Sequence, residues 1–127
     1  RRIAPIQPEA TLLRARIAIS EGNLRLARRM LDEQIELTPD HSGLYELSSS
    51  VMYLETRYDD AGIELETASR LGAPAWRVAY HRGLILEATG RRAEAAGAYR
   101  VCVELEPDFA PARSRLRALA VLDGQRR

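Results

Sequence analysis

Residues 21–40 read EGNLRLARRMLDEQIELTPD, and residues 89–108 read TGRRAEAAGAYRVCVELEPD. The two stretches lie 68 positions apart, and they share a Gly, an Ala, a Leu and a terminal Pro-Asp pair in the same order. If 68 is two periods of a repeat, a third copy must lie halfway between them, at a spacing of 34.

The third copy is present, with no insertion or deletion. Ala27, Ala61 and Ala95 fall 34 residues apart. Six further sets align at the same spacing: Ala15, Ser49 and Gly83; Ala18, Met52 and Leu86; Gly22, Thr56 and Gly90; Leu31, Leu65 and Tyr99; Gln34, Ala68 and Cys102; Leu37, Leu71 and Leu105. A fixed period of this length is typical of repeat proteins, in which each copy is one supersecondary unit.

Each copy has the pattern of two amphipathic helices. Apolar residues recur at intervals of three and four in both halves. They are Leu44, Leu47, Val51 and Leu54 in the first half of copy two, and Leu24, Ala27, Leu31 and Ile35 in the second half of copy one. The small residues at the aligned positions of both helices predict a close crossing within each pair.

The turns between the expected helices carry their own signals. Gly22 and Gly90 stand where a first helix must end, because Gly takes the left-handed C-terminal conformation without strain. Asn23 follows, and its side chain can cap the next helix. The sequences TPD and EPD at 38–40 and 106–108 end the second helices, because Pro disfavours helix for the residue before it.

This spacing resembles the tetratricopeptide repeat (TPR) family, whose signature is W-x-x-L-G-x-x-Y, then A-x-x-x-F, then P. The third copy matches best, through Gly83, Leu86, Ala95, Tyr99 and Pro107. It departs from the signature at Ala79 and Arg82, where the family prefers Trp and Leu. Pentatricopeptide repeats, with a period near 35, are the alternative, and the unbroken spacing of 34 favours TPR.

The resemblance implies an all-α fold, a right-handed helical-hairpin solenoid of three TPR units with a C-terminal capping helix. The three copies span residues 8–41, 42–75 and 76–109, within a repeat region of 8–109. Residues 1–7 are expected to be an N-terminal linker or the remnant of a preceding helix. Residues 110–127 are expected to form the capping helix, over 110–122, and a frayed tail. Such a cap gives the terminal repeat a polar outer surface.

Composition narrows the class of function. The chain has 127 residues and a net charge of +1, and all nineteen of its basic residues are Arg, a bacterial-type, Arg-rich composition. The near-neutral charge argues against a nucleic-acid partner, which favours a clearly basic domain. No apolar run approaches 18 residues, so no membrane insertion is expected. We expect a soluble chain of the cytoplasm or the periplasm.

The sequence carries no catalytic signature. It has two His, His41 and His81, and one Cys, Cys102, without the spacing of a metal site. It contains no nucleophile elbow, phosphate loop or dinucleotide fingerprint. Cys102 aligns with packing positions and is predicted to be a small buried residue. We therefore predict a protein that is not an enzyme and needs no cofactor and no metal.

In a TPR stack the first helices line the concave side, and the resemblance implies a peptide-binding groove there. The residues that it points to are Leu12, Arg16, Ile19, Glu46, Ser50, Tyr53, Arg77, Tyr80, His81, Leu84 and Glu87. The Leu and Ile positions are equally compatible with packing, whereas Tyr and Arg are typical anchors for a ligand.

Some TPR proteins bind the C-terminal carboxylate of a chaperone with a clamp of Lys, Asn and Arg. Those places hold Leu12, Arg16 and Leu47, followed by Arg77 and His81. Only the pair in copy three has compatible chemistry, so the resemblance does not extend to this ligand.

The sequence thus predicts a non-catalytic protein–protein interaction module or scaffold that holds a peptide or a partner helix in its concave groove. Two alternatives remain. The first is self-association, or an intramolecular structural segment of a larger protein. The second is Arg-mediated binding of nucleic acid or an anionic surface, which would show a steep dependence on salt.

Overall fold

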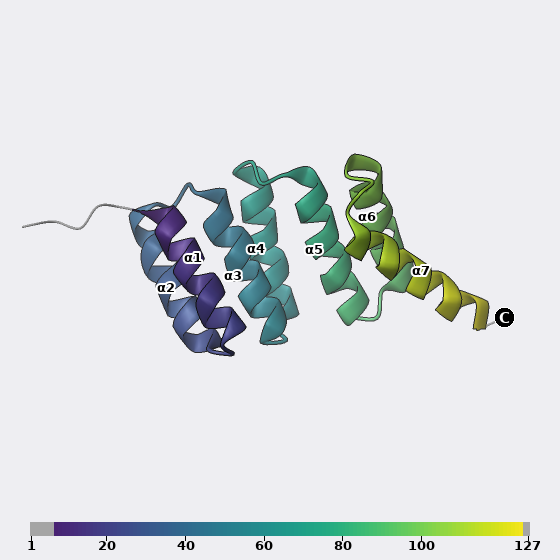
Figure 1. Cartoon of the computed structure of the whole chain (residues 1–127), viewed down its shortest axis with the longest axis horizontal. Coiled ribbons are helices and arrows are strands. Elements are labelled where there is room, and N and C mark those ends of the chain that lie inside the picture. Colours follow the sequence, from purple (N-terminus) through teal and green to yellow (C-terminus); the bar gives the residue numbers. More distant parts are fainter. Residues whose placement is uncertain (1–6, 126–127) are drawn as a thin grey trace, which may run out of the picture. The chain divides into compact units, whose positions relative to one another are not determined.

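The computed structural model describes residues 7–125 and forms seven α-helices within them, with no strand (Figure 1). The helices are α1 (Pro8–Ser20), α2 (Leu24–Leu37), α3 (Ser42–Leu54), α4 (Tyr58–Arg70), α5 (Ala75–Ala88), α6 (Arg92–Leu105) and α7 (Ala110–Gln125). The prediction of an all-α fold made of helical hairpins is confirmed. The linker expected over residues 1–7 lies outside the described residues except for Gln7.

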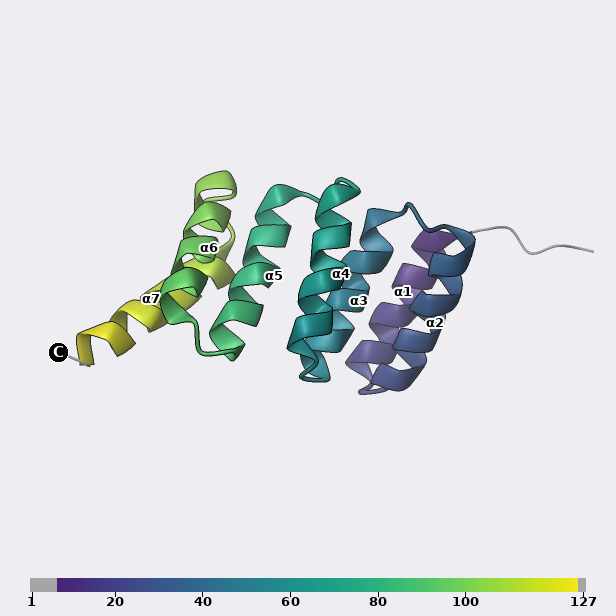
Figure 2. The same cartoon turned by 180° about the vertical axis from the view of Figure 1, so that it is seen from behind.

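The chain divides into two compact units, with the boundary in the sequence between Ala73 and Pro74. The first unit contains α1 to α4, and the second contains α5 to α7. Within each unit, successive helices pack as neighbours, as the views from the front and from behind both show (Figures 1 and 2). In the first unit α1 also contacts α3, so the two first helices lie side by side.

The core of the first unit joins α1, α2 and α3. Its buried residues are Leu12, Ala15, Ala18, Ala27, Leu31, Leu44 and Val51, with Ile19, Leu24, Leu26, Ile35 and Leu47 packed against them. Ala15 and Ala27 are fully buried, which allows α1 and α2 to approach closely, as their alignment predicted. The pair of α3 and α4 is joined in the same place by a hydrogen bond, because the Ser49 hydroxyl donates to the carbonyl oxygen of Ala61 at 2.8 Å.

The core of the second unit joins α5, α6 and α7. Its buried residues are Ala79, Ala95, Tyr99, Cys102, Ala112 and Leu119. Gly83 lies at the crossing of α5 and α6, where an added Cβ would stand 2.5 Å from Cε1 of Tyr99. Cys102 is fully buried, as predicted, and burial raises the pKa of its thiol.

The first helices end as the sequence predicted. Gly22, Thr56 and Gly90 all have positive φ, at 79°, 61° and 83°. Each of these turns closes with the same pair of backbone hydrogen bonds; in the first, Gly22 donates to the carbonyl of Ile19 and Asn23 to that of Ala18. This is the Schellman arrangement of a helix C-terminus. Thr56 adopts the same conformation without the freedom of glycine.

Asn23 caps α2 as predicted, because its side-chain oxygen accepts a hydrogen bond from the amide of Leu26 at 3.2 Å. The second helices α2 and α6 end at Leu37 and Leu105, just before the TPD and EPD sequences. The middle copy has its proline one place later, at Pro74.

Helix α4 therefore ends differently, one residue earlier in the repeat, at Arg70. It closes on Gly72, which has a φ of 101°. The amides of Gly72 and Ala73 donate to the carbonyls of Ser69 and Ala68, as in the first-helix turns. Glycine thus ends this helix where proline ends the other two.

Helix α7 is longer than the sequence predicted. It continues to Gln125, three residues beyond the expected helix over 110–122. Ala112 and Leu119 lie on its inner face and are buried against the second unit. Arg113 and Arg117 of this helix are exposed.

Candidate protein-binding surfaces

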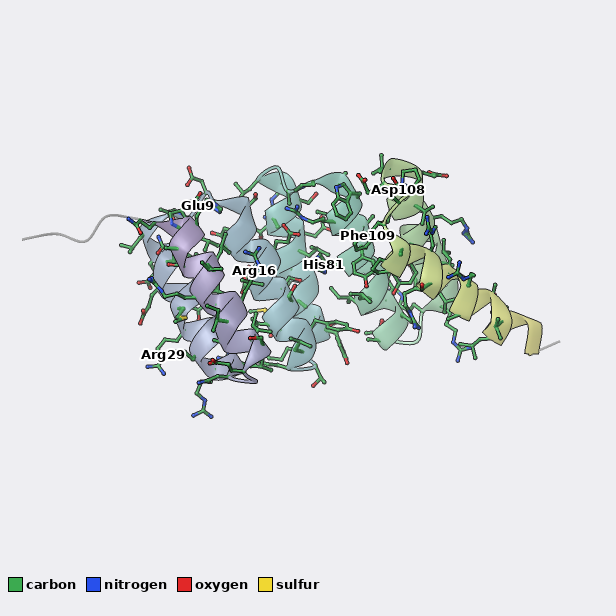
Figure 3. All side chains as sticks on the ribbon, viewed as in Figure 1. Glu9, Arg16, Arg29, His81, Asp108 and Phe109 are labelled. Atoms are coloured by element: carbon green, nitrogen blue, oxygen red, sulfur yellow. The ribbon has the colours of Figure 1, made fainter. Side chains whose placement is uncertain are left out.

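The predicted groove residues of the first unit lie on α1 and α3, but they differ in how much of each side chain a ligand can reach. Leu12 is only 7% exposed and belongs to the core, and Ile19 packs against that core. Arg16 is exposed on α1 (Figure 3). Of the three predicted residues on α1, a ligand can therefore reach the Arg16 side chain and the part of Ile19 that is exposed.

On α3 the predicted residues are more enclosed. Glu46 is 9% exposed, so its carboxylate is largely removed from solvent. Ser50 is half-buried and donates a hydrogen bond to the carbonyl of Glu46 at 3.4 Å. Tyr53 is half-buried and meets the ring of Tyr58 edge-on, with centroids 5.7 Å apart. Tyr53 is the largest side chain that α3 presents at this surface.

The predicted residues of the second unit gather around an aromatic cluster. Tyr80 stands at its centre, with its ring centroid 4.9 Å from that of Phe109 and 5.8 Å from that of His81. The ring centroid of Trp76 also lies 4.9 Å from that of Phe109. We call Trp76, Arg77, Tyr80, His81 and Phe109 the α5 aromatic cluster.

A cation borders this cluster. The guanidinium carbon of Arg77 lies 5.8 Å from the ring centroid of Trp76, within the range in which an aromatic ring attracts a cation. Arg77, Trp76, Tyr80, His81 and Phe109 are all partly exposed. Leu84 is also partly exposed, and like Trp76, Tyr80 and Phe109 it packs against the core of the unit.

Glu87 lies on the same helix but is committed to an internal network. It accepts a hydrogen bond from the hydroxyl of Tyr99 at 2.8 Å. It also accepts two from Arg115 on α7, one of them from Nε at 3.1 Å. We call these three residues the Glu87 network. It joins α5, α6 and α7, so it holds the unit together and leaves this carboxylate little capacity for a ligand.

The ionisation of the Glu87 network agrees with this role. Burial alone would raise the pKa of Glu87, but the hydrogen bonds from Arg115 and Tyr99 outweigh it, so the pKa lies below its ordinary value. The pKa of the Tyr99 phenol is raised, by burial first and then by its hydrogen bond to Glu87. Glu87 is therefore the anion and Tyr99 a neutral donor at neutral pH.

Sequence reasoning missed two members of the α5 aromatic cluster, Trp76 and Phe109. They are the single Trp and the single Phe of the chain, and they lie almost one repeat apart. Because this spacing is close to one repeat, it could have indicated that the two aromatic residues occupy similar places in successive repeats. The TPR signature did not reveal them because it expects its aromatic residue later in the helix, at the position of Ala79.

Other kinds of site are not indicated in the part of the chain that the structure describes. Residues 7–125 contain no group of three or more His, Cys, Asp or Glu that could hold a metal ion. None of the helices among these residues is long and apolar enough to cross a membrane. His41 is half-buried, and its Nε2 lies 3.2 Å from the carboxylate of Glu9.

Solved structures show what this fold is. YrrB, a TPR protein with an unusual peptide-binding site, matches with a TM-score of 0.76 and 21% identity over 94% of this chain. The first TPR of Spaghetti (RPAP3), bound to an HSP90 peptide, matches with a TM-score of 0.80 and 18% identity, over 91% of this chain and 94% of its own. A mutant O-GlcNAc transferase from Thermobaculum terrenum matches with a TM-score of 0.81 and 24% identity over 87% of this chain. The chain therefore has the fold of the TPR proteins, as the repeat spacing predicted.

The extent of these matches differs. The chain spans 62% of YrrB and 21% of the transferase. No protein-family model matches the sequence, and no curated protein matches it either.

Proposed function

We propose that this chain is a non-catalytic protein-interaction module that binds a peptide or a partner helix through the first helices of its repeats. The observation that carries the proposal is the α5 aromatic cluster. It combines three aromatic rings, an imidazole and a guanidinium on one partly exposed surface. Aromatic and Arg side chains dominate the binding energy of protein interfaces.

The peptide ligands of the structural neighbours support the same class of function. YrrB is described as having a peptide-binding site, and the RPAP3 domain is bound to a peptide. The fold also occurs within an enzyme, the O-GlcNAc transferase, of which it makes up a minor part. Within the predicted groove, Glu87 is used internally, in the Glu87 network, which supports a non-catalytic role for this carboxylate.

The charges of these surfaces indicate the chemistry of the ligand. Arg16 is exposed and Arg77 is partly exposed, while Glu46 is largely buried and Glu87 is held by Arg115 and Tyr99. The accessible polar groups are thus mainly cationic. We infer a ligand that carries carboxylates together with at least one apolar or aromatic residue.

The single tryptophan gives a direct test. Partners recovered by affinity isolation with the whole chain are titrated while the fluorescence of Trp76 is recorded. Binding at the α5 aromatic cluster should shift or quench this emission. Tyr53→Ala or Tyr80→Ala should weaken binding by about 2 kcal/mol if the ring is a buried anchor, and Arg16→Ala or Arg77→Ala should cost less and depend on salt.

The matched control is Arg29→Ala, because Arg29 is exposed on the second helix α2 (Figure 3). Thermal unfolding of each variant separates a lost contact from a lost fold. If Arg29→Ala weakens binding and the four first-helix variants do not, the partner binds on the side of the second helices and the proposed surface is wrong.

A further inference from the structure

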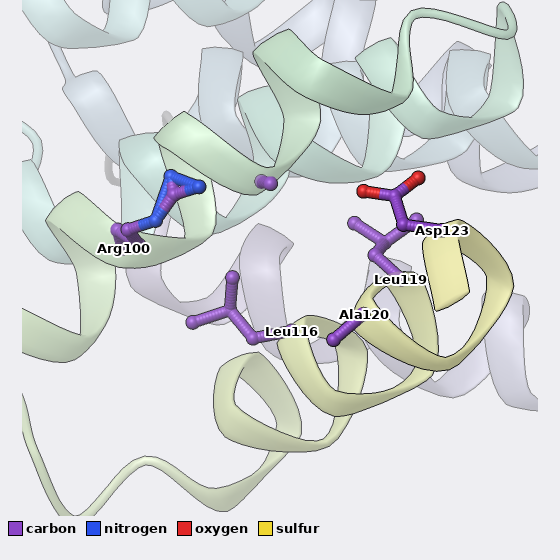
Figure 4. Close-up of a pocket in the computed structure, with 6 residues that line it drawn as sticks. Arg100, Leu116, Leu119, Ala120 and Asp123 are labelled. Carbon is purple, nitrogen blue, oxygen red and sulfur yellow. The ribbon is translucent and has the colours of Figure 1, made fainter. Parts of the chain in front are cut away.

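A second surface lies between α6 and α7. It is an open groove of about 360 Å³, lined by Ala96, Arg100, Leu116, Leu119, Ala120 and Asp123. Figure 4 shows Leu116, Leu119 and Ala120 along its α7 wall, with Arg100 at one end and Asp123 at the other. The groove is thus apolar along its length and carries opposite charges at its two ends.

The repeat itself shows what fits such a groove. Two periods upstream, α2 and α3 of the first unit correspond to α6 and α7 of the second. In the first unit the equivalent side of α3 is covered by α4. The contact with α4 includes the hydrogen bond from Ser49 to the carbonyl of Ala61. The groove on α6 and α7 therefore corresponds to the place that α4 occupies in the first unit.

The groove between α6 and α7 carries a basic residue, Arg100, where the first unit carries an acidic one. At the position of Arg100 the first unit has Asp32, and the pKa of Glu64 on α4 is raised by burial and by the charge of Asp32. The pKa of Asp32 is raised as well, mainly by burial. Two carboxylates thus oppose each other in the first unit. With Arg100 in place of Asp32, the same acidic helix position would meet a cation.

The other end of the groove is acidic in both units. Asp123 corresponds to Glu55, and Glu55 lies 3.5 Å from the guanidinium of Arg57, the residue that precedes α4. A helix in the groove would therefore place a basic residue near Asp123 and an acidic residue seven positions later near Arg100. In α4 these positions are Arg57 and Glu64, with the small residue Ala61 between them.

One position limits how closely such a helix approaches. Arg117 stands where the first unit has Ser49, the residue at the crossing of α3 and α4. A long side chain there holds an incoming helix further from α7 than α4 is from α3. The exposed guanidinium adds a second cation beside the groove, which favours an occupant with an acidic first turn, as α4 has in Asp59 and Asp60.

We propose that the groove between α6 and α7 is a docking site for an amphipathic helix of a partner protein. The partner helix carries Arg, then Ala four residues later, then Glu three residues after that, and runs in the direction of α4. This surface is separate from the α5 aromatic cluster, so the proposal does not depend on the proposed function.

The test uses a helix of known sequence as the probe. A peptide with residues 57–70 of this chain is stabilised by a side-chain bridge between its positions 59 and 63, which are exposed in α4. It is titrated into the whole ¹⁵N-labelled chain. Saturable amide shifts should appear at Ala96, Arg100, Leu116 and Ala120.

A charge exchange makes the test specific. The Glu64→Arg peptide should bind at least about fivefold more weakly, and Arg100→Glu in the protein should restore its binding, since close charge pairs across an interface couple measurably. Arg29→Glu on the exposed face of α2 is the matched control and should change neither affinity. Circular dichroism confirms that each variant is folded.

Three results would overturn the proposal. The first is the absence of saturable shifts at about 1 mM peptide, which would mean that the binding free energy is weaker than about 4 kcal/mol. The second is a set of shifts that lies elsewhere or ignores the charge exchange. The third is concentration-dependent association of the chain with itself that Ala120→Arg abolishes, which would make a second copy the occupant.

Discussion

At the scale of single residues, the third copy differs from the other two by a coupled exchange at the helix crossing. Copies one and two combine Ala15 with Leu31 and Ser49 with Leu65 at the aligned positions. Copy three combines Gly83 with Tyr99, and the Tyr99 ring fills the space that a Cβ at residue 83 would need. The hydroxyl of Tyr99 donates a hydrogen bond to the carboxylate of Glu87.

This exchange predicts a specific non-additivity. Gly83→Ala should destabilise the chain by about 1–3 kcal/mol, because the new methyl group would overlap a buried ring. Tyr99→Leu should also destabilise it, by removing ring contacts and the hydrogen bond to Glu87. The double variant restores the combination of copy one, so its loss in urea unfolding should be clearly smaller than the sum of the two single losses. If the loss of stability in the double variant equals the sum of the two single losses, residues 83 and 99 do not contact each other as described.

A second prediction concerns Thr56, which has a φ of 61° where the other copies have glycine. A β-branched residue is strained in this conformation, so Thr56→Gly should stabilise the chain by about 0.5–1 kcal/mol. Thr89→Gly is the matched control, because Thr89 ends α5 with a φ of −95° and should gain nothing. The midpoints of urea unfolding compare the two. A loss of stability in Thr56→Gly would mean that its hydroxyl matters more than the strain.

Single residues also show what the sequence could reveal. The alignment of Thr56 with two glycines predicted its position in the turn, because turn geometry depends on local backbone only. The Glu87 network was not predictable, because Arg115 lies outside the three copies and no repeat position suggests its partner. Leu12 was placed in the groove by family geometry, but a Leu next to a close helix crossing is buried by its neighbours.

At the scale of elements, α7 is attached to the second unit by an apolar face and by the Glu87 network. Leu119 is 3% exposed and belongs to the core of that unit. Leu119→Ala should therefore cost about 2–4 kcal/mol. Leu122→Ala, on the same helix at a residue 37% exposed, should cost much less. Equal effects in thermal unfolding would show that α7 does not pack as described.

The Glu87 network makes part of the stability depend on pH. The pKa of Glu87 is lower in the folded chain than its ordinary value of 4.5. Its stabilising contribution is thus present above that value and is lost as the pH falls through the folded pKa. Glu87→Gln cannot titrate, so its stability should fall less between pH 7 and about pH 3 than that of the natural chain. Urea unfolding at the two pH values measures the difference.

Asp32 provides the opposite control. Its pKa is raised in the folded chain, mainly by burial, so its charged form is penalised and stability is lost as the pH rises through the folded pKa. Asp32→Asn should therefore be more stable than the natural chain at pH 7, and its loss of stability on acidification should be larger. The same direction of change in Asp32→Asn and Glu87→Gln would contradict these assignments.

The elements were more predictable than the surfaces. Gly and Pro act on adjacent backbone, so the ends of α2 and α6 could be predicted from two tripeptides. The end of α4 at Arg70 followed the same logic through Gly72, although its proline is displaced. The α5 aromatic cluster depends on how Phe109, in a connection between helices, turns toward Trp76 and Tyr80. Such a contact between distant residues is not encoded in any local pattern.

At the scale of the whole molecule, two compact units share one TPR architecture and present different surfaces. The first unit offers Arg16 and Tyr53, and the second offers the α5 aromatic cluster. We propose that each unit binds its ligand through its first helices, α1 and α3 in the first unit and α5 in the second. The second helices supply packing and charged outer faces.

Amide hydrogen exchange of the chain, with and without a partner recovered by affinity isolation, tests this claim most directly. The partner should slow exchange in α1, α3 and α5, most strongly around Tyr53 and Tyr80, and should leave the exposed faces of α2 and α4 unchanged. Protection confined to α2 and α4 would contradict this proposal.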